Sequence, residues 1–305
     1  MKKDLLSLYD LSKADIDAIL DRAAVLKKKH RTGKADYPLR GKSLGLIFEK
    51  PSTRTRVSFE TGIFQLGGQA VYLRWEDTQL GRGESMHDTA MTLSRYLDGI
   101  MIRTFSQSVV EEFASCADIP VINGLTDLCH PCQALADILT VNEKKGSYAG
   151  IKAVYIGDGN NVAVSWIFAA LRLGFDLTLA CPDGHGPDRD VLARAQQEAP
   201  SDIRMVSDPY LAVKDADVIS TDTWVSMGQE AERQERLRAF DGFQVNEDLV
   251  AASKPDVMVM HCLPAHRGEE ITDGVMDGKH SVVFDQAENR LHAQKAVLEI
   301  LMGQK

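Results

Sequence analysis

The feature that most constrains this sequence is a repeated alternation of short apolar runs with longer stretches whose apolar residues recur at helical spacing. Short apolar runs between turn residues are typical of buried strands, and strands that alternate with helices form parallel sheets. The predicted strands are residues 43–48, 70–73, 99–103, 120–124, 151–156, 176–180, 203–206, 217–221, 257–260 and 281–284. The pattern therefore predicts an α/β protein with doubly wound parallel sheets.

A chain of 305 residues is long enough for two domains of ordinary size. The stretch most typical of a linker is 143–147, Glu-Lys-Lys-Gly-Ser. We expect a first domain over residues 1–141, completed by a C-terminal helix at 289–305, and a second domain over 147–288. Each would contain one parallel sheet, and helices would join the two.

The net charge of −9 argues against a general binder of nucleic acid or of anionic membranes. No apolar run approaches the roughly 20 residues that span a bilayer. The N-terminus leads into a helical pattern interrupted by polar residues and not into the core of a signal peptide. Five cysteines, an odd number spread along the chain, do not suggest a disulfide framework. We therefore expect a cytoplasmic protein.

The turn between the predicted strand at 43–48 and the helix that follows it carries an unusual charge. Ser52 stands where a helix N-cap is expected, and Arg54 and Arg56 occupy the first turn. A helix N-terminus is partially positive and favours Asp or Glu, yet no acid stands at the third helical position to close a capping box. Backbone amides, hydroxyls and guanidinium groups at one helix end predict a bound anion, and a phosphate fits. The alternative is a surface turn whose arginines point to water.

A second polar cluster, Cys129-His130-Pro131-Cys132-Gln133, precedes another helical pattern. A C-x-x-C beside a histidine is compatible with zinc or redox chemistry, but no second ligand pair with zinc spacing accompanies it. His130 and Gln133 at a helix start are better suited to hydrogen-bonding an oxygen-rich ligand, with simple helix capping as the alternative. Near the C-terminus, Arg290 is a further phosphate candidate or a surface cation.

In the second half, Gly157-Asp158-Gly159 follows a predicted strand and opens a helix, as a dinucleotide fingerprint would. Asp183 lies about the right distance downstream to contact a ribose, which keeps an NAD-dependent enzyme as an alternative. Val162 replaces the third glycine, however, and two asparagines occupy the approach to the helix. These side chains favour a zwitterionic small molecule over a pyrophosphate.

Polar residues also follow the carboxyl ends of several predicted strands, where ligands bind in open α/β sheets. Asn161, Asp222, Ser226 and Cys262 occupy such positions and are expected to converge. Cys262 could serve as a covalent nucleophile or as a binding group. His261 is adjacent to Cys262 in sequence, but adjacency alone does not place its imidazole where it could act as a base.

Taken together, these motifs resemble the aspartate/ornithine carbamoyltransferase family over nearly the whole chain. The matching motifs are Ser52-Thr53-Arg54-Thr55-Arg56, His130-Pro131-Cys132-Gln133, Asp222 with Ser226-Met227-Gly228, and His261-Cys262-Leu263-Pro264. Within that family, Ser226-Met227-Gly228 and Cys262-Leu263-Pro264 mark the ornithine branch. Cys132 stands where many relatives carry Thr.

The resemblance implies two binding sites and a set of catalytic residues. The residues implied for carbamoyl phosphate are Ser52, Thr53, Arg54, Thr55, Gln79, Arg103, His130, Pro131, Cys132, Gln133, Cys262, Leu263 and Arg290. Those implied for ornithine are Asn161, Asp222, Ser226 and Met227, and those implied for catalysis are Arg103, His130, Cys262 and Arg290. Gln79 would be lent to the site of a neighbouring subunit in a homotrimer or a multiple of trimers.

The implied reaction transfers the carbamoyl group of carbamoyl phosphate to the side-chain amine of L-ornithine, giving L-citrulline and phosphate, as in arginine biosynthesis. The site would lie in the cleft between the domains and would need no metal or organic cofactor. Alternatives within the family are transfer to putrescine or to an N-acylated ornithine, and Ser226-Met227-Gly228 argues against both. An NAD-dependent dehydrogenase leaves the arginine cluster unexplained. A non-enzymatic sensor of a phosphate ligand would not need Asp222 and Cys262 together.

Overall fold

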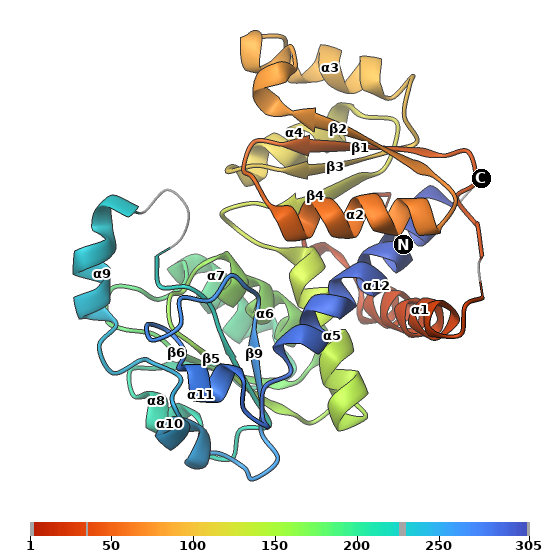
Figure 1. Ribbon diagram of the computed structural model, residues 1–305. Helices are drawn as coiled ribbons and strands as arrows, with labels where there is room; N and C mark the ends of the chain where they lie inside the picture. Colours follow the sequence, from red (N-terminus) through yellow and green to blue (C-terminus); the bar gives the residue numbers. More distant parts are fainter. Residues whose placement is uncertain (1–2, 35, 226–229, 304–305) are drawn as a thin grey trace. The chain divides into compact units, whose positions relative to one another are not determined.

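The computed structural model describes residues 3–34, 36–225 and 230–303. The chain divides into two compact units. Unit 1 comprises Met1–Leu139 and Glu288–Lys305, and unit 2 comprises Thr140–Ala287. The boundaries fall within two helices, α5 (Pro131–Lys145) and α12 (Val283–Met302), shown in Figure 1.

Unit 1 is built on a parallel sheet in the order β2-β1-β3-β4. Its strands are β1 (Ser43–Phe48), β2 (Gln69–Arg74), β3 (Gly99–Arg103) and β4 (Val121–Leu125), and its other helices are α1 (Lys13–Arg31), α2 (Thr53–Gln65), α3 (Met86–Leu93) and α4 (Gln107–Cys116). In Figure 1, α3 and α4 lie on one side of the sheet, while α2 and α12 lie on the other. The apolar side chains of α3 and α4 pack with Ile47, Ile100 and Ile102 into one core cluster.

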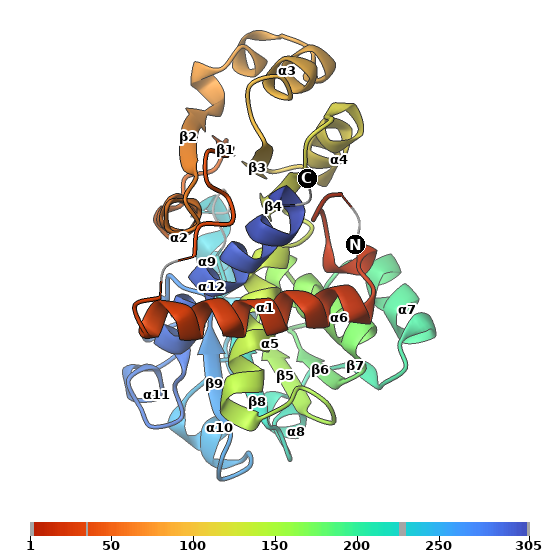
Figure 2. The same cartoon turned by 90° about the vertical axis from the view of Figure 1, so that its right-hand side faces the viewer.

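The C-terminal helix α12 is anchored in unit 1 by α1, which lies beside it in Figures 1 and 2. Arg22 of α1 forms an ion pair of 2.6 Å with Glu299. Lys27 of α1 is buried and donates a hydrogen bond of 2.7 Å to Asn289. The end of the chain therefore belongs to the same folded unit as its beginning.

Unit 2 contains a second parallel sheet, in the order β7-β6-β5-β8-β9. Its strands are β5 (Lys152–Ile156), β6 (Asp176–Ala180), β7 (Ile203–Val206), β8 (Val218–Thr221) and β9 (Met258–His261), and its helices are α6 (Asn161–Leu173), α7 (Arg189–Glu198), α8 (Pro209–Ala212), α9 (Arg233–Ala239), α10 (Glu247–Ala251) and α11 (Asp273–Met276). One core cluster joins β5, β8 and β9 to the helices α8, α10 and α11.

Strand order reverses once in each sheet, between β1 and β3 in unit 1 and between β5 and β8 in unit 2. At such a point the loops that follow the two strands diverge to opposite faces and leave a crevice beyond the strand ends. Most candidate residues of unit 1 lie at or just beyond the ends of β1, β3 and β4, with Gln79 after β2 and Arg290 in α12, and those of unit 2 follow β5, β8 and β9. The topology thus confirms the expected fold class, two doubly wound parallel sheets.

Two local predictions were wrong. Residues 281–284 do not form a strand: Ser281 makes one isolated bridge to Val259, and α12 begins at Val283. Helical hydrogen bonding over 20 residues outweighs a single bridge at the sheet edge. The predicted linker at 143–147 is partly helical, because α5 continues to Lys145. Gly146, at φ 82°, then stops the helix in the left-handed conformation that glycine adopts at little cost.

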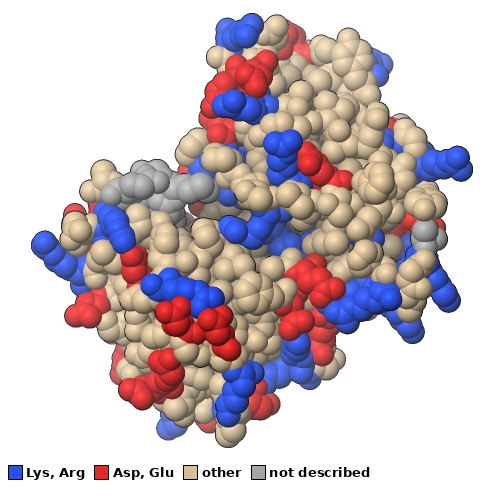
Figure 3. Space-filling model, in the orientation of Figure 1, with Lys and Arg blue, Asp and Glu red and all other residues tan. Residues whose placement is uncertain are grey.

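No helix in the described part of the chain combines the length and the apolar character needed to cross a bilayer. On the face drawn in Figure 3, acidic and basic side chains are interspersed over both units. The surface there lacks the single broad basic field of a general nucleic-acid binder.

Candidate active site

The first candidate cluster begins at the N-terminus of α2. Ser52 is the N-cap, and its hydroxyl accepts a hydrogen bond of 3.2 Å from the backbone N–H of Thr55. The first turn contains no acidic residue, as predicted. This helix start therefore presents backbone amides and partial positive charge without an acid of its own to offset them.

Two buried arginines meet at this helix start. Arg103, at the end of β3, and Arg290, in α12, each donate a hydrogen bond to Thr55 Oγ1, over 3.4 and 3.3 Å. Both side chains are buried. The tertiary structure thus joins three residues that the sequence placed at 55, 103 and 290.

Gln133 ties the same cluster to α5. Its Oε1 accepts a hydrogen bond of 2.7 Å from Arg290, and its Nε2 donates one of 2.8 Å to Asp137. Because Asp137 holds the amide nitrogen, the amide oxygen is turned toward the guanidinium group. Asp137, buried one helical turn beyond Gln133, was not identified from the sequence.

The pKa of His130 indicates the electrostatic potential in the cluster. Burial lowers the pKa of His130 well below 6.5, and the charges of Arg290 and Arg103 lower it further. The imidazole is therefore neutral at pH 7 and lies in a positive potential. Such a site favours an anion.

Other predicted residues of unit 1 are placed differently. Arg56 points away from the cluster: it pairs with Glu60 at 2.9 Å and stacks over Tyr72, so the proposal that it joins Arg54 around an anion was wrong. Thr53, Arg54 and Gln79 are exposed, with Gln79 in the loop after β2. Pro131 is the first residue of α5.

The thiol of Cys132 donates a hydrogen bond to the carbonyl oxygen of Asn123 in β4, over 3.5 Å. Burial raises the pKa of Cys132 to about 12, so the thiol stays protonated. The side chain thus joins α5 to the sheet. Any contact of this residue with a ligand remains a prediction.

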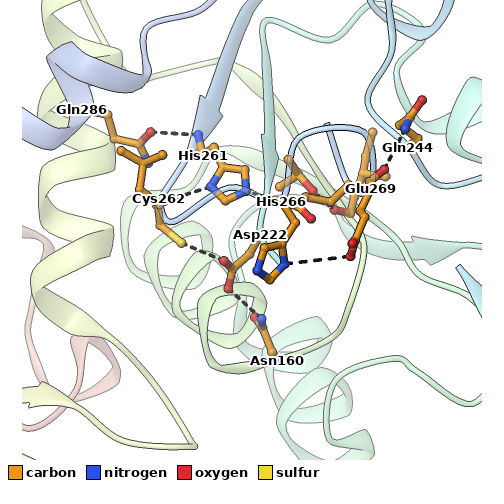
Figure 4. A network of polar contacts seen from close by, with 12 residues as sticks. Asn160, Asp222, Gln244, His261, Cys262, His266, Glu269 and Gln286 are labelled. Atoms are coloured by element: carbon orange, nitrogen blue, oxygen red, sulfur yellow. Dashed lines mark hydrogen bonds and ion pairs between the residues drawn. The ribbon is translucent and has the colours of Figure 1, made fainter. Parts of the chain in front are cut away.

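The second cluster lies in unit 2 and centres on Asp222, at the end of β8. Asn160 donates a hydrogen bond of 2.8 Å to Oδ2 of this carboxylate, and the thiol of Cys262 donates one of 3.0 Å to Oδ1. Figure 4 shows the two donors on the two oxygens of Asp222. Asn160 precedes α6 after β5, and Cys262 follows β9, so three neighbouring strands supply the cluster.

Tyr155 extends this cluster and was not identified from the sequence. Its hydroxyl donates a hydrogen bond of 3.2 Å to Asn160. Burial raises the pKa of Tyr155 well above 10.0, and the carboxylates of Asp222 and Asp158 raise it further. The potential here is negative, which favours a cation such as an ammonium group.

Asn161, the first residue of α6, adjoins the cluster, and Leu263 follows Cys262 in the same turn. Ser226 and Met227 lie outside the described residues.

The residues of the partial dinucleotide fingerprint make contacts within the protein itself. The side chain of Asn160 accepts hydrogen bonds from the N–H groups of Val162 and Ala163, the amides that would bind a pyrophosphate. A Cβ on Gly159 would lie 2.1 Å from the nitrogen of Pro187, so this glycine admits a neighbouring loop of the protein itself. These contacts argue against a bound dinucleotide.

Asp222, His261 and Cys262 bring possible metal-ligand atoms within 4.8 Å of one another. Both ring nitrogens of His261 are nevertheless engaged, Nδ1 with the N–H of Leu263 and Nε2 with Glu270. The donor set therefore fits a hydrogen-bond network better than a cation site.

Comparisons with known proteins match both halves of the chain. Residues 3–143 match the family described as aspartate/ornithine carbamoyltransferase, carbamoyl-P binding domain. Residues 149–301 match the family described as aspartate/ornithine carbamoyltransferase, Asp/Orn binding domain.

Individual relatives match over almost the full length. A protein of Syntrophus aciditrophicus named ornithine carbamoyltransferase is 60% identical over 302 residues, covering 99% of this chain and 100% of the relative. The solved structure of ornithine carbamoyltransferase from Pyrococcus furiosus is 55% identical, with a TM-score of 0.96, covering 99% of this chain and 97% of that one. The anabolic ornithine carbamoyltransferase of Campylobacter jejuni is 39% identical, with a TM-score of 0.93 and full coverage of both chains, 100% each. The chain therefore belongs to the aspartate/ornithine carbamoyltransferase family.

Proposed function

We propose that this protein transfers the carbamoyl group of carbamoyl phosphate to the side-chain amine of L-ornithine, with L-citrulline and phosphate as products. The observation that carries the proposal is the meeting of Arg103 and Arg290 at Thr55, on a helix start that lacks an acid of its own. A dianionic phosphate group suits this arrangement. The acidic cluster around Asp222 suits the ammonium group of an amino acid.

In this proposal, carbamoyl phosphate binds with its phosphate against the N-terminal amides of α2. Ser52, Thr53, Arg54 and Thr55 supply hydroxyl, amide and guanidinium donors. Arg290 is held by Gln133 over 2.7 Å, which limits its reorientation when the ligand arrives. Positive charge that is already in place stabilises the anion without a further cost of rearrangement.

The chemical step is attack of the neutral side-chain amine of ornithine on the carbonyl carbon. Negative charge develops on the carbonyl oxygen, where Thr55, Arg103 and His130 act as hydrogen-bond donors. The carbon–oxygen bond to phosphate then breaks, and phosphate leaves with the electron pair. The attacking amine loses its proton to the departing phosphate or to solvent. Because the pKa of His130 is depressed, its ring acts as a neutral donor.

The ornithine end of the site is assigned to unit 2. Asp222 attracts the ammonium group of ornithine, and Cys262 and Asn160 fix the orientation of the carboxylate. Asn161, Ser226 and Met227 complete the set of residues that would hold the amino acid. The phosphate group would thus bind at the positively charged cluster of unit 1, and the ammonium group at the negatively charged cluster of unit 2.

We also propose that the protein forms homotrimers, alone or in multiples. The support is an exposed apolar surface on unit 1: Val57 and Phe64 of α2 are 54% and 75% exposed, and Val71 of the edge strand β2 is 37% exposed. The exposed Gln79 follows β2 in the chain. A neighbouring copy would cover this surface and receive Gln79 in its own site.

The relatives named anabolic, from Pyrococcus furiosus and Campylobacter jejuni, support a biosynthetic role in making arginine. We propose that this role is exercised in the cytoplasm. The proposed reaction uses only protein side chains and the two substrates.

The test is a product assay with the purified protein, carbamoyl phosphate and ornithine. We expect citrulline and phosphate in equal amounts. Putrescine and N-acetylornithine, offered in place of ornithine, should give no product. Absence of citrulline would refute the proposal, and product from putrescine alone would reassign the substrate.

A further inference from the structure

The turn that carries Cys262 and Leu263 is held by a buried pair that no step above uses. His261 ends β9, and its side chain is fully buried, as is that of Glu270. Nε2 of His261 lies 3.0 Å from Oε1 of Glu270. Burying a carboxylate and an imidazole costs free energy, because both groups lose hydration. Their contact therefore indicates a role in the structure of the turn.

The geometry fixes which nitrogen carries the proton. The backbone N–H of Leu263 points at Nδ1 of His261 over 2.9 Å. A backbone amide can only donate, so Nδ1 is the acceptor and Nε2 holds the hydrogen that Glu270 accepts. With both nitrogens engaged inside the protein, His261 is not placed to touch a substrate.

Leu263 is the residue that this hydrogen bond holds. Its φ is 61°, in the left-handed region, which is unfavourable for a residue with a Cβ. A hydrogen bond from its own N–H to a fixed imidazole offsets part of that cost. The backbone of Leu263 therefore depends on the orientation of the His261 ring.

Glu270 holds the ring from the far side of the loop. Its Oε1 also accepts a hydrogen bond from the backbone N–H of His266. One carboxylate oxygen thus connects the end of β9 to the middle of the loop that returns from it. At the start of the same turn, the backbone N–H of His261 donates to Gln286 over 2.9 Å, as Figure 4 shows.

The turn delivers Cys262 to Asp222. The thiol of Cys262 lies 3.0 Å from Oδ1 of Asp222, between the fixed His261 and the fixed Leu263. We propose that Glu270 and His261 are positioning residues that set the backbone of Cys262 and Leu263, and hence the ornithine-binding geometry around Asp222. This inference rests on the proposed function for its kinetic readout, but not for its structural one.

The structural readout is the alkylation rate of Cys262 by iodoacetamide. Cys129, Cys132 and Cys181 are buried, and Cys116 is the other partly exposed thiol, so Cys116→Ser is the background. His261→Phe keeps the ring and removes both hydrogen bonds, and Glu270→Leu removes the acceptor. Each should change the labelling rate by about tenfold, roughly the value of one lost hydrogen bond.

The conservative variant Glu270→Gln separates positioning from stability. An amide oxygen in the place of Oε1 still accepts from His261 and His266. The amide nitrogen takes the place of Oε2, which has no hydrogen-bond partner in the part of the chain described. This variant should therefore unfold at a lower temperature, yet keep the labelling rate of Cys262 and the KM for ornithine.

The kinetic readout is the KM for each substrate. His261→Phe and Glu270→Leu should raise the KM for ornithine about tenfold while the KM for carbamoyl phosphate changes less than threefold. The matched control is His280→Phe, which removes the contact of a ring nitrogen with the carbonyl oxygen of Val257 in the same unit, over 2.8 Å. It should leave the labelling rate and both KM values unchanged.

The outcomes are distinct. Unchanged labelling and an unchanged KM for ornithine in His261→Phe would overturn the positioning role, with the wild-type enzyme still active. If Glu270→Gln altered the labelling rate of Cys262 and the KM for ornithine as much as Glu270→Leu does, the assignment of the role to hydrogen bonding would be overturned. A wild-type protein that makes no citrulline would instead refute the proposed function, and the labelling experiment would still decide this inference.

Discussion

Arg290 Nη1 donates a hydrogen bond of 2.7 Å to Gln133 Oε1, across 157 positions of the chain. Arg290 also reaches Thr55, so one guanidinium group connects the helices α12, α5 and α2. The last helix of the chain therefore completes a site that begins at the first βα turn. The planar fork of arginine makes both contacts from one group.

Arg290→Lys should raise the KM for carbamoyl phosphate about tenfold or more, because an ammonium group keeps the charge but not the two-sided geometry. The KM for ornithine should change little. Steady-state kinetics with each substrate varied in turn would measure this. Arg22→Lys is the matched control, since Arg22 bonds Glu299 of the same helix outside the cluster. Equal effects of the two variants would contradict the assignment.

Arg54 and Arg56 stand two positions apart on α2 and should behave differently. Arg54→Ala should weaken binding of carbamoyl phosphate by well over tenfold, because a charge-assisted contact is lost. Arg56→Ala should weaken it less than twofold, because Arg56 contacts Glu60 and Tyr72. Calorimetric titration would give both affinities. A negligible loss for Arg54→Ala would make that arginine a surface residue only.

Asp222→Asn keeps the size of the side chain and removes its charge. The KM for ornithine should rise at least about tenfold, since a buried charge contact is worth more than ~1.4 kcal/mol. Calorimetry should show unchanged binding of carbamoyl phosphate. Asp217→Asn is the control, because Asp217 precedes β8 at its opposite end and pairs with Lys254 at 2.7 Å. A similar rise in KM for Asp217→Asn would indicate general damage to unit 2.

Stability should fall as the pH drops below 6.5, in part through His292 in α12. The pKa of His292 is lowered from 6.5 to about 4, mainly by burial; Glu288 acts in the opposite direction, and the charges of Lys27 and Lys295 contribute to the decrease. Between these values the unfolded chain binds a proton that the folded chain does not. The free energy of unfolding therefore decreases across this window, by at most about 1.4 kcal/mol per pH unit for one group.

Urea unfolding of the wild type and of His292→Leu at pH 8.5, 7.5, 6.5 and 5 would test this dependence. The wild type should lose stability faster than the variant between pH 6.5 and 5, and the difference between them should be constant above pH 7.5. His130, with a pKa lowered in the same direction, contributes with the same sign in both proteins. If the free energy of unfolding decreased equally with falling pH in both proteins, His292 would be excluded as a source of this pH dependence.

Gln79 should act in the site of a neighbouring subunit. Gln79→Ala and Arg290→Ala should each be nearly inactive alone. If the protein assembles as the proposed trimer, co-expression should give mixed trimers in which some sites combine an intact Arg290 with an intact Gln79 from the neighbour. Citrulline formation should then return to a substantial fraction of the wild-type rate. No recovery in mixed trimers, verified by mass, would place Gln79 in its own subunit or outside the site.

Local pattern was sufficient for most of the fold. The strand at Ser43–Phe48 and the helix after Ser52 formed as predicted, because the apolar run and the N-cap residue that indicate them are local features of the sequence. The failure at residues 281–284 has the opposite cause. Apolar character there fits both a strand and a helix, and the contacts of α12 decide between them.

The site was only partly readable for the same reason. Ser52, Thr55, His130 and Gln133 belong to local motifs, and so do Asp222 and Cys262. Asn160 was visible as one of two asparagines at a helix start, but its hydrogen bond to Asp222 joins two strands that are distant in sequence. Tyr155, Asp137 and Glu270 carry no local signal, because each acts through a partner chosen by packing.

The sequence by itself determined the alternation of strands and helices, the open helix start at Ser52, and the residue types needed to bind a phosphate and an ammonium group. Only the tertiary structure decided that Arg103 and Arg290 meet at Thr55 while Arg56 turns away to Tyr72. The physical reason is that the strand order of each sheet determines which loops lie side by side. Arg56, adjacent to Thr55 in sequence, contacts Glu60 and Tyr72 instead, whereas Arg290, 235 residues away, donates a hydrogen bond to Thr55.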